Sequence, residues 1–174
     1  MAVDPRLSSL GHRLIVAADQ SLAVSGYSLV DESAYDAHRI AAGVPEGGLD
    51  FAYGESFPHD VDMDQLSGVA FDKGCFVGQE VVSRMEHRGT GRRRIVQVMA
   101  ASPIPPVGAE IIAGEKPVGV IATSAGHAGL AMVRLDRVKE AVEAGTPLLS
   151  RGLPVEIALP DWARFRFPDG DASR

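Results

Sequence analysis

The chain has 174 residues, of which 45% are hydrophobic and 23% charged, a composition typical of an ordinary folded protein. Its 23 acidic and 17 basic residues give a formal net charge of −6, so we expect no direct nucleic-acid binding without a local basic patch. The single cysteine excludes an internal disulfide and a self-contained Cys-rich zinc or iron–sulfur site, so any iron–sulfur cluster would belong mostly to a partner.

Two short apolar runs near the amino terminus predict a pair of strands. The first run is 14–16 and the second is 22–24, with Asp19 and Gln20 between them as turn residues. The pattern is typical of a hairpin, although two strands alone cannot close a hydrophobic core.

The segment 31–42 gives the clearest helical pattern. Ser33 and Asp36 resemble a capping box at its start, and Gly43 and Pro45 are expected to end the helix after residue 42. A face of small side chains suits close packing against a sheet; it consists of Ala34, Ala37 and Ala41.

Tyr35 and Arg39 lie four residues apart on this helix and therefore share a different face. One interpretation is a ligand site, with an aromatic ring for stacking and a guanidinium for a carboxylate. The other is that Tyr35 is a partly buried helix residue and that Arg39 is solvated.

The segment 46–64 is irregular and carries His59 among three acids, Asp60, Asp62 and Asp64. Their spacing fits no standard set of metal ligands. We therefore expect the acids to be solvated or to cap a turn, and we predict no metal site.

The stretch 72–80 holds the only cysteine, Cys75, next to Lys73 and between Gly74 and Gly78. A helix is expected to begin near Gly78, and both its positive end and the lysine ammonium favour the thiolate form of the cysteine. The glycines tolerate positive φ angles and allow close approach to the backbone. A reactive thiol is one interpretation; a small apolar side chain buried in the core is the other.

The helix predicted over 79–88 begins with Gln79 and Glu80. These two residues either orient a ligand near the cysteine or only start the helix, where a carboxylate suits the dipole. The apolar face of the helix is expected to be buried and consists of Val81, Val82 and Met85.

Five arginines follow closely on one another in this region: Arg84, Arg88, Arg92, Arg93 and Arg94. They could bind a polyanion, such as RNA or the glutamate tail of a folate. We favour the alternative that they pair with the acids of the chain itself.

The second half of the chain alternates short strands with proline and glycine. The predicted strands are 95–100, 110–113, 118–123, 130–135 and 155–159, with a short helix over 136–144 that Asp136 caps and Gly145 ends. So many short strands in so few residues predict a small antiparallel barrel. Aromatic residues in the tail, 161–174, are expected to dock on this barrel before the chain turns polar.

The string 73–80 reads Lys-Gly-Cys-Phe-Val-Gly-Gln-Glu. It resembles the signature of the YgfZ-type family, folate-binding proteins related to the glycine cleavage T-protein, whose usual form is Lys-Gly-Cys-Tyr/Phe-x-Gly-Gln-Glu. The stretch 39–45 resembles the helix and turn that precede this signature. The resemblance implies an α+β fold, in which residues 1–91 form the end of a T-protein-like folate-binding module, 92–160 a carboxyl-terminal β-barrel and 161–174 a tail.

The resemblance also implies a function. Such proteins assist the assembly or repair of iron–sulfur clusters in client proteins, including enzymes that methylthiolate tRNA, with tetrahydrofolate as ligand. Cys75 and Lys73 would then be the reactive residues. The expected folate-binding residues are Tyr35, Arg39, Gly74, Gly78, Gln79 and Glu80. Because the chain resembles only the carboxyl-terminal part of the family, we expect the folate site to be incomplete.

Two other functions stay open. One is a tetrahydrofolate-dependent aminomethyltransferase like the T-protein, which carries no cysteine at this place. The other is an interaction module whose cysteine is inert. The start of the chain shows no charged region followed by an apolar run, and no stretch is long enough to span a bilayer, so we expect a cytosolic protein without membrane contact.

Overall fold

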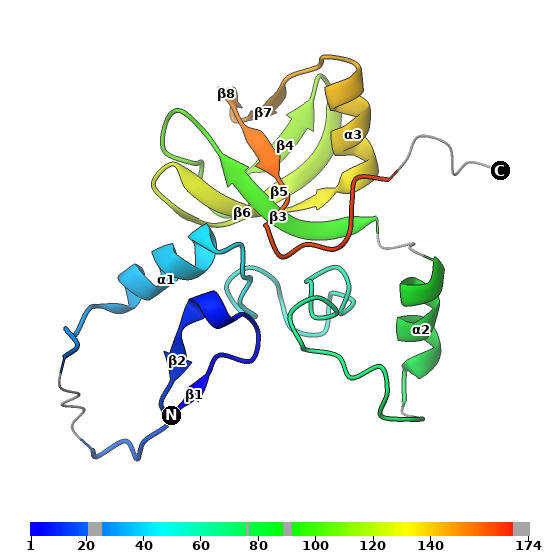
Figure 1. Cartoon of the computed structure of the whole chain (residues 1–174). Helices are drawn as coiled ribbons and strands as arrows, with labels where there is room; N and C mark the ends of the chain where they lie inside the picture. Colours follow the sequence, from blue (N-terminus) through cyan, green and yellow to red (C-terminus); the bar gives the residue numbers. More distant parts are fainter. Residues whose placement is uncertain (21–25, 76, 89–91, 169–174) are drawn as a thin grey trace.

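The computed structural model describes residues 1–20, 26–75, 77–88 and 92–168. Its elements, in chain order, are β1 (Ala2–Val3), the 3₁₀ helix η1 (Ser8–Leu10), β2 (His12–Arg13), α1 (Glu32–Ala41), α2 (Gln79–Arg88), β3 (Arg93–Met99), β4 (Glu110–Ala113), β5 (Lys116–Ala125), β6 (Ala128–Arg134), α3 (Leu135–Glu143), β7 (Leu148–Ser150), β8 (Leu153–Pro154) and β9 (Glu156–Ala158). Figure 1 shows the large sheet above, with α1 and α2 on opposite sides beneath it.

The large sheet is an antiparallel barrel of seven strands in the order β8-β7-β4-β5-β6-β3-β9. The two strands at the ends of this order are consecutive in the chain, because only Val155 separates β8 from β9. The backbone N–H of Val155 donates to the carbonyl of Leu148 on β7 at 2.9 Å, while β9 pairs with β3. One continuous stretch therefore pairs with both sides of the sheet and closes the barrel.

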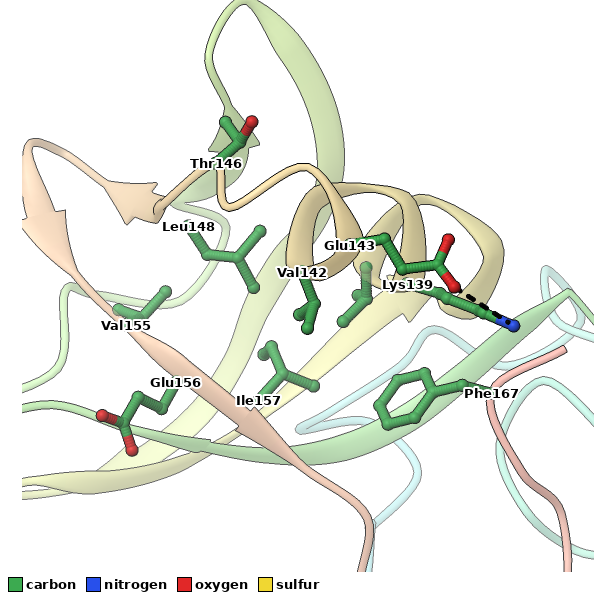
Figure 2. Close-up of a pocket in the computed structure, with 10 residues that line it drawn as sticks. Lys139, Val142, Glu143, Thr146, Leu148, Val155, Glu156, Ile157 and Phe167 are labelled. Carbon is green, nitrogen blue, oxygen red and sulfur yellow. Dashed lines mark ion pairs between the residues drawn. The ribbon is translucent and has the colours of Figure 1, made fainter. Parts of the chain in front are cut away.

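The barrel interior is filled by branched side chains, including Val96, Val98 and Ile111, each fully buried. Helix α3 contributes Leu135, Val138 and Ala141 to the same core, as its apolar face predicts. Each buried Val, Leu or Ile side chain of this core contributes about 1.5–3 kcal/mol by its removal from water. Beside this core, Figure 2 shows a pocket of about 640 Å³ that α3 and β9 line together with Phe167.

A second core lies on the outer face of the barrel. Ile95, Ala122 and Leu130 point outward from β3, β5 and β6 and pack with Ile40 of α1 and Val61. Strand β3 is consequently buried on both faces, which explains why its consecutive residues Ile95 and Val96, which point to opposite faces, are both apolar.

Helix α1 confirms the predicted segment, but its start differs in detail. The N-cap is Asp31, whose carboxylate accepts from the N–H of Ala34 at 3.1 Å and from the hydroxyl of Ser33. A capping box that begins at Ser33 is therefore wrong. The end is as predicted, since Gly43 takes a φ of 73° where a Cβ would also lie 2.7 Å from Pro160.

The side chains that α1 buries are not the predicted small ones. Ala34 and Ala41 are exposed, whereas Arg39 and Ile40 are buried against the barrel. The prediction of a buried alanine face is therefore wrong. The helix instead buries the large apolar side chain of Ile40 and the guanidinium of Arg39, whose charge is fully paired.

Three further predictions need correction. The predicted amino-terminal hairpin is wrong in its first strand, because residues 14–16 form no strand and Ile15 is exposed. The strands that pair in this region are β1 and β2. The second predicted strand, 22–24, lies outside the described residues. The expected buried face of α2 is wrong, because Val81 is 45% exposed and Val82 and Met85 are only partly buried. The five strands and the last helix are confirmed within a few residues, but the N-cap of that helix is Arg134 and Asp136 lies in its first turn, so the predicted cap is wrong. Strands β7 and β8 were not predicted.

The tail docks as expected. The indole N–H of Trp162 donates to the carbonyl of Ala42, and Phe165 and Phe167 pack against the barrel core. No helix within the described residues combines the length and the apolar character needed to cross a membrane.

Candidate functional site

Cys75 lies exposed on the loop that precedes α2. Gly74 and Gly78 on either side of it have φ angles of 82° and 86°, a backbone conformation that disfavours other residues. Lys73 is exposed as well. The interpretation of Cys75 as a buried apolar side chain is therefore wrong, and its thiol is open to large reactants.

The two polar residues at the start of α2 lie on the surface. The carboxylate of Glu80 accepts from the guanidinium of Arg84 at 2.5 Å, one helical turn away. Gln79 is partly buried. Glu80 is thus engaged along its own helix, an arrangement that suits a helix start.

Tyr35 lies on α1, which Figure 1 shows on the opposite side of the molecule from α2 and the loop before it. Its hydroxyl accepts a hydrogen bond of 2.7 Å from Arg6, which also pairs with Asp4. A cavity of about 660 Å³ opens here, lined by Asp4, Arg6, Leu10, His12, Arg13, Leu14, Ile15, Tyr35 and Glu46. None of these lining residues comes from 73–80, so the structure does not bring Tyr35 and the cysteine loop together.

Arg39 is fully buried, so a solvated Arg39 is wrong. Its guanidinium donates to Asp36 at 2.8 Å, to Asp50 at 2.6 Å and to the hydroxyl of Thr123 at 3.3 Å. Burial lowers the pKa of Arg39, but the bonds to Asp36 and Asp50 outweigh burial and raise it. The geometry gives this residue a structural role and points none of these donors at a cavity.

Asp50 joins α1 to the barrel. Its Oδ2 accepts from Arg39, and its Oδ1 accepts from both the backbone N–H and the hydroxyl of Thr123 on β5, at 2.9 and 2.5 Å. A fully buried carboxylate needs such partners to remain charged. The role of Asp50 could not be predicted from the sequence, because no local pattern marks an acid whose partners lie far along the chain.

The three acids near His59 are buried and paired, so the expectation that they are solvated or caps is wrong. Asp60 accepts from Arg93 at 2.6 Å, and Asp64 holds Arg94 through both carboxylate oxygens at 2.6 and 3.0 Å. The prediction that the arginines pair with internal acids is confirmed for Arg84, Arg93 and Arg94. The side chain of Arg88 lies outside the described residues.

Asp62 and Asp64 share Arg94 as a partner, but their pKa values are shifted in opposite directions. Burial raises the pKa of Asp62 well above its ordinary value, because Arg94 reaches only one oxygen, at 3.2 Å, and the other has no partner among the described residues. Burial also raises the pKa of Asp64, but the hydrogen bonds from Arg94 and Gln65 and the charge of Arg94 together outweigh burial and lower the pKa.

The two substitutions Asp62→Asn and Asp64→Asn are expected to change the free energy of unfolding with opposite signs. The neutral form of Asp62 stabilises the fold below its unfolded pKa of 3.8, and this contribution is lost as pH rises through the raised folded pKa. D62N removes the charge and suits the φ of 60°, so it should stabilise the protein at neutral pH by about 1 kcal/mol.

D64N removes a paired charge and should destabilise the protein by about 1.5–3 kcal/mol. Urea unfolding of both variants at neutral pH and in acid measures the difference. The gain from D62N should fade as the pH falls towards 3.8. A D62N variant that is less stable than the parent at neutral pH would contradict the conclusion that burial raises the pKa of Asp62.

His59, Asp64 and Glu86 place donor atoms within 4.8 Å of one another, the spacing of a metal site. Their existing bonds fit a metal poorly. Arg94 already occupies both oxygens of Asp64, and Nε2 of His59 contacts Glu86 at 3.2 Å while Nδ1 has no partner among the described residues. A metal on Nε2 would leave a buried N–H unsatisfied, so the geometry favours a link between His59 and α2.

Comparison with known proteins supports the barrel and the general fold. Residues 92–165 match the family model described as CAF17, C-terminal beta-barrel domain. The glycine cleavage system aminomethyltransferase T from Bartonella henselae superposes on 78% of this chain and 39% of its own, with a TM-score of 0.56 and 20% sequence identity. This likeness shows the fold, and it confirms an α+β chain with a carboxyl-terminal barrel.

The chain is also similar to proteins called iron–sulfur cluster assembly factor IBA57, mitochondrial. The Mus musculus and Homo sapiens proteins are each 32% identical over 91% of this chain and 46% of their own length. A homologue from Mycosarcoma maydis is 42% identical over 60% of this chain and 27% of its own. The chain thus spans about half the length of the mammalian relatives.

These relatives contradict the expected cytosolic location, since they are mitochondrial proteins. The expectation rested on features of the segment itself, which do not report the compartment of a protein. The chain thus shares the fold of the glycine cleavage aminomethyltransferase, its residues 92–165 match the CAF17 barrel model, and in sequence it is similar to about half of an IBA57 protein.

Proposed function

We propose that this chain acts in iron–sulfur cluster assembly, and that Cys75 is the side chain that binds the cluster during its transfer. The observation that carries the proposal is the exposed thiol on a glycine-flanked loop in front of α2. The names of the similar proteins support the same function.

The cluster is cargo in this proposal, because one cysteine cannot hold it alone. The thiol of Cys75 loses its proton, and the thiolate sulfur donates an electron pair to one iron while another thiolate leaves that iron. The other irons and ligands stay with the donor or client protein.

Client proteins such as tRNA methylthiolases and tetrahydrofolate as ligand are proposed by resemblance alone. The residues described here do not make a folate pocket between them, since Tyr35 lies apart from the cysteine loop and Arg39 is fully engaged inside the fold. We therefore assign no step to folate.

The substitution Cys75→Ser is expected to abolish cluster binding without loss of stability, because the exposed side chain makes no packing contribution. The measurement is visible circular dichroism on addition of a glutathione-ligated [2Fe–2S] cluster, whose chiral signal rises when the protein binds it. Thermal unfolding reports stability in parallel.

A matched control moves the thiol elsewhere. The double variant C75S/S28C places a cysteine on another exposed stretch, and it should bind the cluster no better than C75S. Equal signals from C75S and the parent would refute the role of Cys75. Equal signals from the parent and C75S/S28C would show that any exposed thiol suffices.

A further inference from the structure

A cleft of about 660 Å³ is lined by residues of α2 and of the carboxyl-terminal segment 164–168, in which exposed and partly buried residues alternate. It belongs neither to the cysteine loop nor to the cavity at Tyr35. Its lining residues are His59, Asp64, Gln65, Ser67, Val69, Phe71, Met85, Glu86, Arg92, Arg94, Leu135, Arg164, Phe165, Arg166 and Pro168. In Figure 1 this carboxyl-terminal segment (red) passes beneath the barrel and then turns upward, on the same side of the molecule as α2.

The alternation of the segment places two arginines on its open face. Phe165 and Phe167 pack against the barrel core, and the guanidinium carbon of Arg94 lies 4.5 Å from the ring centre of Phe165. In an extended chain successive side chains point to opposite faces. Arg164 and Arg166 are therefore exposed while the aromatic residues anchor the backbone between them.

The charges of the cleft are unbalanced. Four arginines and two carboxylates line it, in a chain whose net charge is −6. Asp64 is paired with Arg94, and Glu86, whose side chain is 45% exposed, shares a hydrogen bond with His59. The guanidiniums of Arg164 and Arg166 make no ion pair or hydrogen bond with any described residue. The lining is therefore locally positive with two arginines available to a ligand.

The spacing of these arginines points to the class of ligand. Residues two apart in an extended chain lie about 6.6–6.8 Å apart, the same separation as alternate side chains of an extended peptide. The cleft is also lined by apolar side chains, which could contact the residues that lie between the carboxylates of such a peptide. These apolar side chains include Val69, Phe71 and Met85. We propose that this cleft docks an extended acidic segment of a partner protein, with carboxylates at alternate positions on Arg164 and Arg166.

This docking would place the partner near the cysteine loop. Glu86 lines the cleft on α2, and the helix rises about 10 Å over the seven residues back to Gln79. The cleft contains no residue of 73–80, so the proposal does not rest on the function proposed for Cys75.

The test uses the full chain and a fluorescent acetyl-Glu-Leu-Glu-Leu-Glu amide, with the Gln-Leu-Gln-Leu-Gln peptide beside it. We expect only the glutamate peptide to bind, with an affinity that falls as NaCl is added. R164Q and R166Q should each weaken binding by about three- to tenfold, the usual value of a charge-assisted contact at a partly exposed site. R151Q, which removes an exposed arginine remote from the cleft, should leave binding unchanged.

Four results would overturn the proposal. These are no binding of the glutamate peptide, equal binding of the glutamine peptide, an unchanged affinity in R164Q/R166Q, and displacement by inorganic phosphate well beyond that by NaCl of equal ionic strength. Alkylation of Cys75 in the same variants should keep the parent rate. Failure of docking is thereby separated from failure of the cysteine loop.

Discussion

Replacing Arg39 by methionine is expected to lower the free energy of unfolding by about 3–5 kcal/mol, the cost of breaking a buried ion pair by removal of one partner. The side chains of Arg39 and Asp50 are both 0% exposed and lie 2.6 Å apart. Methionine fills most of the space but leaves the carboxylate of Asp50 charged and buried. Urea unfolding followed by far-ultraviolet circular dichroism measures the loss.

The chain offers a control for this result. Arg84→Met removes an arginine that is 58% exposed and paired with Glu80, and it should change stability by less than about 0.5 kcal/mol. In R39M/D50N the stranded charge is also gone, so this double variant should be more stable than the sum of the single losses predicts. Additive losses would show that Arg39 acts through packing and not through Asp50.

Replacing Arg94 by methionine should cost a similar amount, about 3–5 kcal/mol at neutral pH, because two buried acids lose their shared partner. Asp62 and Asp64 have side chains that are 0% and 1% exposed, and the backbone carbonyl of His59 also accepts from Arg94 at 2.7 Å. The loss should appear as an earlier midpoint in urea.

The loss in R94M should depend on pH with a definite sign. Arg94 lowers the folded pKa of Asp64, so their bond stabilises the protein above the unfolded value of 3.8 and is lost as pH falls through the lowered pKa. Without Arg94 both acids can take up protons. The difference in the free energy of unfolding between R94M and the parent should therefore become smaller as the pH falls from about 7 to about 3. A gap that is constant with pH would contradict the role of this ion pair.

The sequence predicted the parts of the structure that depend on local pattern. Glycine and proline between β-branched runs located the strands of the barrel, and Gly43 located the end of α1 because its backbone takes a positive φ there. The cysteine loop was found because its glycines and its lone thiol are visible in the sequence. The structure leaves that thiol exposed, and its proposed role is still to be tested.

The buried charges could not be predicted in the same way. Arg39 and Asp50 meet Thr123, more than seventy residues along the chain, and Asp64 meets Arg94 thirty residues away. An isolated acid or arginine is usually solvated, so its burial is known only when the partner that neutralises it is placed beside it. Tyr35 and Cys75 were assigned to one folate site by resemblance, and the fold sets them apart.

The boundary at residue 92, where the match to the barrel family begins, does not separate two independent folding units. The outer face of the barrel carries Ile95, Ala122 and Leu130, which the first half covers with Ile40 and Val61. The barrel expressed alone would expose this apolar patch to solvent and would be prone to aggregate. Arg94 would also lose its ion-pair partners, Asp62 and Asp64. Expression of the barrel as a separate domain would therefore require polar substitutions on this patch, or the presence of residues 1–91 to cover it.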